Sequence, residues 1–386
     1  MAHAESKFTS VEICAGAGGQ AVGLHEAGFR HLALIEIDEH ACATLESNVT
    51  GNPEWDGCKV LKRDLKEFKV DELGLKPGEL DLLAGGVPCP PFSAAGKQLG
   101  EDDERDLFPT MLNMVEALRP KAVMIENVRG LLEPPEKFSR YREEVIERRL
   151  REAGYVKCYW KILEACDYGV PQLRPRAVLV AMLKEYAEHF EWTEPKTRPL
   201  LTVAEALAQS MRKRFEESGR PEWKTFYERW LKEAQKGSVA PTLVGGSKKH
   251  GGADLGPTRA KEAWRKLGVC GLGVANEPKD LKDPDRDLFS ERGPKLTVSQ
   301  AAIIQGFPEG WKFEGRKTAA YRQVGNAFPP PVAQAVGEQI IAALERGTKA
   351  LADAEGDTLF ELPAPSAPPG PELGDRSGDR ECAAVS

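Results

Sequence analysis

The regular alternation of short apolar runs with helical patterns over the first 185 residues constrains the fold of this chain most strongly. Apolar runs typical of strands occupy residues 11–14, 31–38, 81–86, 122–128 and 176–183. Helical patterns separate them at 20–29, 39–49 and 108–120. This alternation predicts an α/β fold with a mostly parallel sheet and helices on both faces. In such sheets, ligands bind beyond the carboxyl ends of the strands.

A glycine-rich loop follows the first predicted strand. The stretch EICAGAGGQAVGL contains Gly16, Gly18 and Gly19 and opens a helix. Glycines let the backbone turn tightly and approach a ligand closely, and their spacing fits the dinucleotide-binding pattern G-x-G-x-x-A. The G-K-[ST] of a phosphate-binding loop is missing, which disfavours ATP. The loop therefore indicates an adenosine-type site for NAD or S-adenosylmethionine, with a tight turn without ligand as the simpler alternative.

Two carboxylates extend this adenosine-type site. Glu36 lies at the end of the second predicted strand, where it can accept hydrogen bonds from both ribose hydroxyls. Asp64, in the stretch KRDL, is expected at the end of the third strand, where it can accept a hydrogen bond from an adenine amine. Because both strand ends lie at the edge where the glycine loop lies, we expect a single pocket.

Cys89 stands in a loop stiffened by prolines, GGVPCPPFSAAGKQ, directly after the apolar run 81–86. Proline lacks a backbone donor and fixes φ, so this stretch is neither a helix interior nor a central strand. The loop therefore places a thiol at the ligand edge of the sheet. Glu126 follows the next apolar run and adds a carboxyl group at the same edge. For a cysteine alone, a small buried apolar residue is the commoner interpretation.

Three polar side chains alternate in the stretch QLRPR. Gln172, Arg174 and Arg176 share one face if the chain is extended there. Two guanidinium groups and an amide that point the same way suit a planar ligand rich in oxygen. Each arginine alone is typical of ordinary surface charge, whereas their convergence with the thiol and the carboxyl group on one edge favours a catalytic site.

Together, these stretches resemble the DNA (cytosine-5) methyltransferases. The resemblance runs from Val11 to Leu344 and comprises, in order, EICAGAGG, GGVPCPPFS, ENVRGLL, QLRPR and YRQVGNAFPPPVAQAVG. It implies a Rossmann-like methyltransferase sheet that depends on S-adenosyl-L-methionine, with helices on both faces, plus a smaller, loop-rich target-recognition domain. It also implies double-stranded DNA as the partner. The expected role is the modification arm of a prokaryotic restriction-modification system, with a cognate endonuclease acting on the same site.

The resemblance assigns catalytic roles to four residues. Cys89 matches the nucleophile that adds to C6 of a cytosine flipped out of the duplex. Glu126 matches the group that protonates N3, and burial is expected to raise its pKa so that it holds a proton near neutral pH. Arg176, with Arg174, matches the group that holds the base O2.

The resemblance also assigns the cofactor site. The implied residues are Gly16, Ala17, Gly18, Gly19, Gln20, Glu36, Asp64, Leu107, Asn326 and Ala327. The first five would line the methionine part, while Glu36 would bind the ribose and Asp64 the adenine. Cys14 departs from the family, which often has an aromatic residue there that packs on the adenine. We therefore expect adenine stacking to be weaker, or supplied by another residue.

The charge distribution indicates a polyanion partner, although the net charge of −7 alone argues against one. Residues 196–275 hold 16 Lys and Arg against 8 Asp and Glu, whereas residues 351–386 hold 2 against 8. A basic segment inside an acidic chain is the electrostatic footprint of a polyanion partner, with a solvated basic surface that has no partner as the simpler alternative. The expected DNA contacts are Ser93, Gln172, Lys248, Lys249, Arg259 and Lys261. Lys and Arg in this segment would contact phosphates or guanine edges.

These observations predict four parts of the chain. Residues 1–190 are expected to form the catalytic and cofactor-binding domain, and residues 191–295 the target-recognition domain. Residues 296–347 would complete the catalytic domain. Residues 348–386, acidic and rich in Pro and Gly, are expected to be disordered.

Two other functions remain open on the sequence. A tRNA cytosine-5 methyltransferase has the same architecture, but the long basic insert argues for duplex DNA. A catalytically silent DNA-binding regulator would have no chemical need for Cys89, Glu126 and Arg176 together. An NAD-dependent dehydrogenase is disfavoured, since no proton-relay histidine stands in a suitable context.

The remaining expectations concern the setting of the protein. The 8 cysteines form no C-x-x-C pair, so no zinc or other metal site is expected. Scattered thiols suit a reducing compartment, and the N-terminus shows no secretory signal. No apolar run reaches the length of a membrane helix. We therefore expect a cytoplasmic monomer that associates with the nucleoid when it acts.

Overall fold

The computed structural model describes residues 8–88, 106–195, 199–245 and 253–360. Its centre is a seven-stranded sheet in the order β3-β2-β1-β4-β5-β7-β6. The strands are β1 (Phe8–Ile13), β2 (Phe29–Glu36), β3 (Lys59–Lys62), β4 (Leu82–Gly85), β5 (Ala122–Val128), β6 (Tyr155–Glu164) and β7 (Pro175–Leu183). The pairs among β1 to β5 are parallel, whereas β7 is antiparallel to both β5 and β6. The predicted α/β class with a mostly parallel sheet is confirmed.

Helices cover both faces of this sheet, as predicted. They are α1 (Gly19–Ala27), α2 (Glu39–Val49), α3 (Phe108–Leu118), α4 (Arg148–Glu152), α5 (Lys184–Ala187) and the first part of α12 (Pro330–Phe360). Successive side chains of β4 point to opposite faces. Leu83 joins the core under α3, while Leu82 and Ala84 join the core under α1 and α12. Burial on both sides explains why the central strands are continuous apolar runs.

β6 was not predicted from the sequence. Its residues, YVKCYWKILE, are mostly half-buried, and apolar side chains alternate irregularly with Lys157 and Lys161. Since β6 is an edge strand with one neighbour, β7, it lacks the continuous apolar run of the central strands. Lysines on an edge strand also discourage pairing with other chains.

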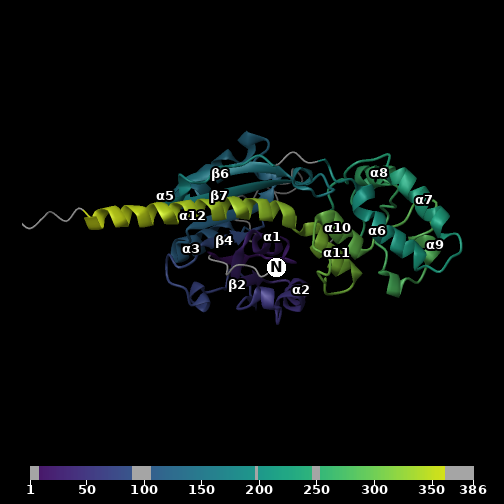
Figure 1. Ribbon diagram of the computed structural model, residues 1–386, viewed down its shortest axis with the longest axis horizontal. Helices are drawn as coiled ribbons and strands as arrows, with labels where there is room; N and C mark the ends of the chain where they lie inside the picture. Colours follow the sequence, from purple (N-terminus) through teal and green to yellow (C-terminus); the bar gives the residue numbers. More distant parts are fainter. Residues whose placement is uncertain (1–7, 89–105, 196–198, 246–252, 361–386) are drawn as a thin grey trace, which may run out of the picture.

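A second body lies beyond the carboxyl edge of the sheet. It contains α6 (Val203–Glu216), α7 (Trp223–Ala234), α8 (Thr258–Lys266), α9 (Pro284–Asp287), α10 (Val298–Gln305) and α11 (Lys317–Asn326). Figure 1 shows the sheet and α12 on the left, α6 to α9 on the right, and α10 and α11 between them. One apolar core runs through the second body from Val203 to Ala327. Because α10 packs on α6, the expected boundary at 295 falls inside this shared core.

α12 returns the chain to the sheet and then continues outward. Its buried residues, from Val332 to Leu344, belong to the core that α1 shares. The prediction of disorder from residue 348 was wrong for 348–360, because α12 extends to Phe360. Ala, Leu and Lys in that stretch favour a helix, and the packed part of α12 already supplies the nucleus. Residues 361–386 lie outside the described residues.

No described helix combines the length and the apolar character that crossing a lipid bilayer requires.

Candidate active site

The segment that leads to the expected nucleophile is fixed at the carboxyl end of β4. Cys89 and Ser93 themselves lie outside the described residues. Just before them, Val87 is buried, and its carbonyl oxygen accepts a hydrogen bond of 2.9 Å from Asn127 Nδ2. Asn127 belongs to β5 and is also buried. The chain that carries Cys89 therefore leaves the sheet from a point held by the neighbouring strand.

A cavity of about 720 Å³ opens at this point. The ends of β4 and β5 and residues 130–138 form one side of it, together with Arg174 and Arg176. Residues 242–245 and 325–326 of the second body form the other side. The cavity thus lies between the sheet and the second body, where open α/β sheets bind ligands.

Glu126 and Arg176 form an ion pair in this cavity. Arg176 Nε lies 2.8 Å from Glu126 Oε1, and both side chains are largely buried, with exposed fractions of 13% and 14%. The antiparallel pairing of β5 and β7 places Arg176 opposite Val128 and Glu126 opposite Val178. The two charged residues are therefore diagonal neighbours on one face of the sheet. This juxtaposition agrees with the convergence expected from the sequence.

Burial raises the pKa of Glu126, which is the direction expected from the sequence. The positive charges of Arg176 and Arg174, together with the hydrogen bond from Arg176, act in the opposite direction but do not cancel the effect of burial. The backbone also leaves space for this carboxyl group, because a Cβ on Gly86 would lie 3.0 Å from Glu126 Oε2. A buried carboxyl group with a raised pKa can hold and donate a proton.

Arg174 takes a different place from the one expected. Its side chain is 1% exposed, and its Nη atoms donate to the carbonyl oxygens of Leu243 (2.7 Å), Gly325 (2.8 Å) and Ala327 (2.9 Å). Although Arg174 contributes to the cavity wall, these two nitrogens bind the backbone of the second body. Only Arg176 directs its guanidinium group at Glu126 among the described residues.

Gln172 is likewise buried rather than presented to DNA. It is fully buried, and its Nε2 donates to Gln305 Oε1 over 2.8 Å. Its Oε1 accepts from the Leu243 backbone N–H over 2.7 Å. The Gln172 amide therefore bonds buried protein groups and is not exposed on a surface that DNA could contact.

The glycine loop and Glu36 are joined by hydrogen bonds. Glu36 Oε2 accepts from Gly16 N over 2.7 Å, and Oε1 accepts from the backbone of Ile37 and Asp38, both over 2.8 Å. The carboxylate therefore ties the loop after β1 to the end of β2. A carboxylate has about four lone-pair sites, so these three bonds leave one acceptor site, on Oε2, for a ribose hydroxyl.

The end of α11 packs on the same loop. A Cβ on Gly19 would overlap the Phe328 carbonyl oxygen and lie 3.1 Å from Ala327 Cβ, so only glycine permits this close approach. Trp311 Nε1 donates to the Ala17 carbonyl oxygen over 3.0 Å. The stretch that contains Asn326 and Ala327 thus lies beside the glycine loop, although it is some 300 residues away in the sequence.

Acidic groups surround the position where the family often has an aromatic residue. Cys14 directly follows β1 and has a φ of +51°. Burial and the nearby carboxylates of Glu36, Glu12 and Asp64 raise its pKa to about 12, so it is an inert thiol. Asp64 and Glu36 are thus both close enough to Cys14 for their charges to act on its pKa. Leu107 directly precedes α3 and packs against the same apolar core as Cys14.

The residues present fit S-adenosylmethionine. Both polar atoms of the Gln20 amide are buried and have no hydrogen-bond partner within the described residues. The carboxylates of Glu36, Glu12 and Asp64 lie near Cys14, at the start of the same loop. S-adenosylmethionine carries a positive sulfonium and a positive ammonium group, which nearby carboxylates would stabilise. Its polar atoms could also form the hydrogen bonds that the buried Gln20 amide lacks.

The structure describes two of the expected DNA-contacting residues of the second body. Arg259 is exposed on α8, and Lys261 forms an ion pair of 2.8 Å with Asp254. Lys248 and Lys249 lie outside the described residues. No group of His, Cys, Asp and Glu in the described ranges has an arrangement that could hold a metal ion.

Two functional contacts were missed by sequence reasoning. Asn127 anchors the segment before Cys89, and Trp311 holds the glycine loop. The position of Asn127 directly after Glu126 in the ENV triplet was a usable signal, because successive residues of a strand point to opposite faces. For Trp311 no local signal exists, since its partner is distant in the sequence.

Comparisons with known proteins agree with this arrangement. The family model for C-5 cytosine-specific DNA methylase matches residues 8–342. The chain is 49% identical to Type II methyltransferase M.NaeI of Lentzea aerocolonigenes, over 91% of this chain and 79% of that protein. It is 47% identical to Type II methyltransferase M.NgoMIV of Neisseria gonorrhoeae, over 88% of this chain and 99% of that protein.

Solved structures share the fold. One is a DNA modification methyltransferase, assigned as putative in its description, encoded within an Escherichia coli prophage. It matches with a TM-score of 0.56 and 19% identity over 88% of this chain and all of that one. The Dnmt2 methyltransferase of S. pombe matches with a TM-score of 0.52 and 16% identity, over 88% of this chain and 99% of that one.

Proposed function

Because this chain belongs to the C-5 cytosine-specific DNA methylase family, we propose that it methylates one cytosine of a specific duplex sequence through a covalent bond from Cys89 to C6 of the base. It is a DNA (cytosine-5) methyltransferase of the Type II restriction-modification kind, and S-adenosylmethionine is its cofactor. The Glu126–Arg176 pair, in the cavity beside the segment leading to Cys89, carries the finer proposal.

The proposed chemistry begins with the thiol. Cytosine C5 is too weak a nucleophile to take a methyl group directly, but adding the Cys89 thiolate to C6 makes C5 part of an enamine. S-adenosylmethionine supplies an electrophilic methyl group. After methylation, the proton on C5 leaves to a base, the bond between Cys89 and C6 breaks, and the C5–C6 double bond returns. The proton that Glu126 gives to N3 during the addition returns to Glu126 during this elimination. The thiolate is regenerated, so Cys89 acts catalytically.

Glu126 is proposed to make this addition feasible. Negative charge that develops on the ring when the thiolate adds is relieved by a proton delivered to N3. A buried carboxyl group with a raised pKa is suited to deliver that proton. Arg176 holds Glu126 in place from the neighbouring strand and is proposed to hold the base O2 with its remaining donors.

The base must leave the duplex to reach these groups. Flipping costs a few kcal/mol of unstacking and unpairing, which contacts in the pocket must offset. The cavity, at about 720 Å³, has room for a base and part of its backbone. Ser93 is proposed to contact a phosphate near the target base.

The cofactor is proposed to lie at the ends of β1, β2 and β3. Residues 16–20 would line its methionine part, Glu36 its ribose and Asp64 its adenine. Leu107, Asn326 and Ala327 would complete the pocket. This placement is supported by the close packing of the Ala327 stretch on Gly19.

The second body is proposed to read the DNA sequence. Lys248, Lys249, Arg259 and Lys261 are proposed to contact phosphates or base edges, in keeping with the excess of Lys and Arg in residues 196–275. The protein is proposed to act as a monomer on double-stranded DNA, alongside an endonuclease that recognises the same site.

A methyl-transfer assay tests the proposed function. The wild-type protein is incubated with tritiated S-adenosylmethionine and either unmethylated duplex DNA or unmodified tRNA. Label is expected in the DNA and not in the tRNA. Glu126→Gln is expected to lower the rate by about 10²- to 10⁴-fold, because general acid catalysis is lost, and Cys89→Ser is expected to lower it at least as much.

The control in this assay is Cys158→Ser. Cys158 is half-buried on β6, where burial raises its pKa to about 12, so the variant should keep the wild-type rate. Full activity of Cys89→Ser, or label in tRNA instead of DNA, would refute the proposal.

A further inference from the structure

Three segments that are far apart in the sequence meet where the second body joins the sheet. These segments, called the seam, are residues 171–174, 240–245 and 325–328. The first two run side by side, because Ala240 N donates to the Pro171 oxygen and Leu173 N to the Ala240 oxygen, both over 2.8 Å. Thr242 Oγ1 adds a hydrogen bond of 2.6 Å to the Leu173 oxygen.

Arg174 binds all three segments with one side chain. It belongs to the first segment, and its Nη1 donates to Leu243 in the second. Its Nη2 donates to Gly325 and Ala327 in the third. A guanidinium group is planar and presents its donors in a fixed geometry, so it sets the positions of these three carbonyl groups relative to one another.

Gln172 closes the network. Its Oε1 accepts from Leu243 N, and its Nε2 donates to Gln305 on α10. Gln305 Nε2 in turn donates to the Ala327 oxygen, which Arg174 also binds. Arg174 Nε is the one buried side-chain nitrogen or oxygen of these three residues that has no hydrogen-bond partner among the described residues. The other bonds hold the network in place, because breaking one of them leaves a further buried group unpaired.

Two glycines bring the backbones of the seam into direct contact. A Cβ on Gly325 would lie 2.5 Å from Gly245 N, and a Cβ on Gly245 would lie 2.5 Å from the Arg322 oxygen. No side chain separates these segments, so a shift of one backbone displaces the other.

Each segment of the seam continues into a functional part of the protein. Two residues after Arg174, Arg176 binds Glu126 in the cavity. The second segment leads from Gly245 into the basic part of the second body. The third segment, at Phe328, packs on Gly19 of the glycine loop.

We propose that Arg174 is a positioning residue that holds the second body in register with the Arg176–Glu126 pair, so that methyl transfer is fast only when DNA is correctly seated on the second body. This inference rests on the proposed roles of Glu126 and Arg176. It assigns Arg174 an action through the seam instead of a contact with the base.

Arg174→Lys is the informative substitution. Lysine keeps the positive charge and most of the stem, but a compact ammonium group cannot reproduce the planar fork that reaches three carbonyl oxygens. At least one buried carbonyl group of the seam loses its donor, and the segments gain freedom to shift. Displacements of about 1 Å far from the chemistry can cost about 10²-fold in rate.

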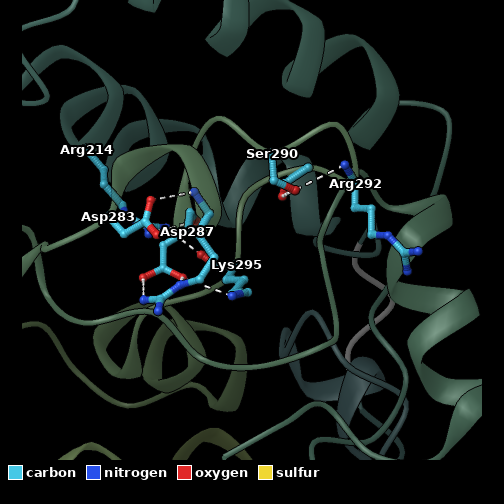
Figure 2. Close-up of polar contacts among 8 residues, drawn as sticks. Arg214, Asp283, Asp287, Ser290, Arg292 and Lys295 are labelled. Carbon is cyan, nitrogen blue, oxygen red and sulfur yellow. Dashed lines mark hydrogen bonds and ion pairs between the residues drawn. The ribbon is translucent and has the colours of Figure 1, made fainter.

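Arg214 offers a matched control. It is also deeply buried, with an exposed fraction of 3%, and it donates to the carbonyl oxygens of Lys295 and Asp287 and to Gln300 Oε1. Figure 2 shows Arg214 beside Asp287 and Lys295, with Ser290 and Arg292 farther along the same loop. Asp287 is held there by ion pairs with Lys295 (2.9 Å) and Arg286 (2.5 Å). Each of these contacts lies inside the second body and away from the seam.

The experiment compares two rates for each variant. Bisulfite sequencing of DNA from cells that express the protein first identifies the methylated site. Single-turnover methyl transfer is then measured on a duplex with that site and on a duplex with one base pair changed, and the ratio of the two rate constants is the discrimination. DNA affinity and thermal unfolding are measured in parallel.

Arg174→Lys is expected to lower the rate on the correct site by about 10- to 100-fold and to lower discrimination by about tenfold, with DNA affinity changed less than about threefold. Arg214→Lys should lose similar thermal stability while both rates stay within about twofold of wild type. Thr242→Val, which removes one hydrogen bond of the seam from a half-buried position, should lower discrimination in the same direction by a smaller factor.

The inference would be overturned if folded Arg174→Lys had the wild-type rate and the wild-type discrimination. It would also be overturned if Arg214→Lys lost as much rate and discrimination as Arg174→Lys. If Arg174→Lys does not fold, unchanged discrimination in Thr242→Val overturns it. The proposed function fails by a different result, namely full activity of Cys89→Ser or Glu126→Gln, so the two failures are distinguishable.

Discussion

At the scale of single residues, the Glu126–Arg176 pair balances two opposing effects. Burial favours the neutral carboxyl group, and the cations Arg176 and Arg174 favour the carboxylate. The net result is a raised pKa, so the group can hold a proton and give it to N3. An exposed glutamate would be ionised near neutral pH and could not act as this acid.

The first prediction concerns pH. Since the protonated form of Glu126 is the active one, the single-turnover rate should fall as pH rises through its raised pKa. Arg176→Met removes a charge that lowers this pKa, so the fall should move to higher pH while the maximum rate decreases. A pH profile of single-turnover methyl transfer measures both effects.

Arg140→Met is the control for the pH profile. It removes an exposed arginine that pairs with Glu144, so the profile should keep its wild-type midpoint. A midpoint that moves to lower pH in Arg176→Met would contradict the assignment of the proton to Glu126.

The residue types of the site were predictable, but their orientation was not. The sequence placed Glu126 and Arg176 at one edge, and the structure brings them to 2.8 Å. Arg174 and Gln172 were expected to face the ligand because alternate residues of an extended chain share a face. The second body decides which contacts the side chains on that face make. No local sequence pattern reveals where that body lies.

At the scale of elements, the ends of β4 and β5 hold the catalytic segment through one side chain. Asn127 Nδ2 bonds the Val87 oxygen two residues before Cys89. Both groups are buried, so losing the donor leaves a buried carbonyl group unpaired.

The second prediction follows from this contact. Asn127→Ala should destabilise the protein by about 1–3 kcal/mol, the cost of one unsatisfied buried group. It should also lower the methyl-transfer rate by about tenfold or more, because the segment before Cys89 loses its anchor. Thermal unfolding and single-turnover assays measure the two effects.

Asn48→Ala is the comparison for Asn127→Ala. Asn48 also bonds a backbone carbonyl group, that of Lys312, but on the exposed side of α2. Asn48→Ala should leave the methyl-transfer rate within about twofold of the wild-type rate. Equal rates for the two variants would show that Asn127 has no special part in holding the segment.

The third prediction concerns α12, whose packed part and outer part differ. Leu344 and the residues before it are buried, whereas residues 351–354 are exposed. A chain that ends at Lys349 should unfold at nearly the wild-type temperature. A chain that ends at Val336 loses Ile340 and Leu344 and should not fold, because burying each such side chain contributes about 1.5–3 kcal/mol. A marked loss of stability in the longer chain would refute this division of the helix.

The central strands were predictable because burial on both faces makes them continuous apolar runs. β6 was not, since an edge strand mixes charged and apolar residues and carries no such run. The outer turns of α12 were mistaken for a tail because their acidic composition resembles that of disordered segments. Residues 349–354, KALADA, nevertheless contain mostly good helix formers, and the helix extends to Phe360.

At the scale of the whole molecule, two bodies share one cavity and one seam. The sequence predicted a basic recognition domain after the sheet, but placed its end at 295, before α10 and α11. Nothing local marks these helices as part of the second core, because their apolar faces suit either body. α10 and α11 belong to the second body because residues 298–324 pack into the same apolar core as α6 and its neighbours.

The most direct test of the account is covalent trapping. A duplex synthesised with 5-fluorocytosine in place of cytosine is incubated with the protein and S-adenosylmethionine, and the product is examined by intact mass spectrometry after denaturation. Fluorine replaces the C5 proton that must leave, so the thiol adduct persists. A protein–DNA adduct is expected in the wild-type protein, with the attachment at Cys89 by peptide mapping, and no adduct is expected in Cys89→Ala. An adduct that survives in Cys89→Ala, or no adduct with active wild-type protein, would contradict it.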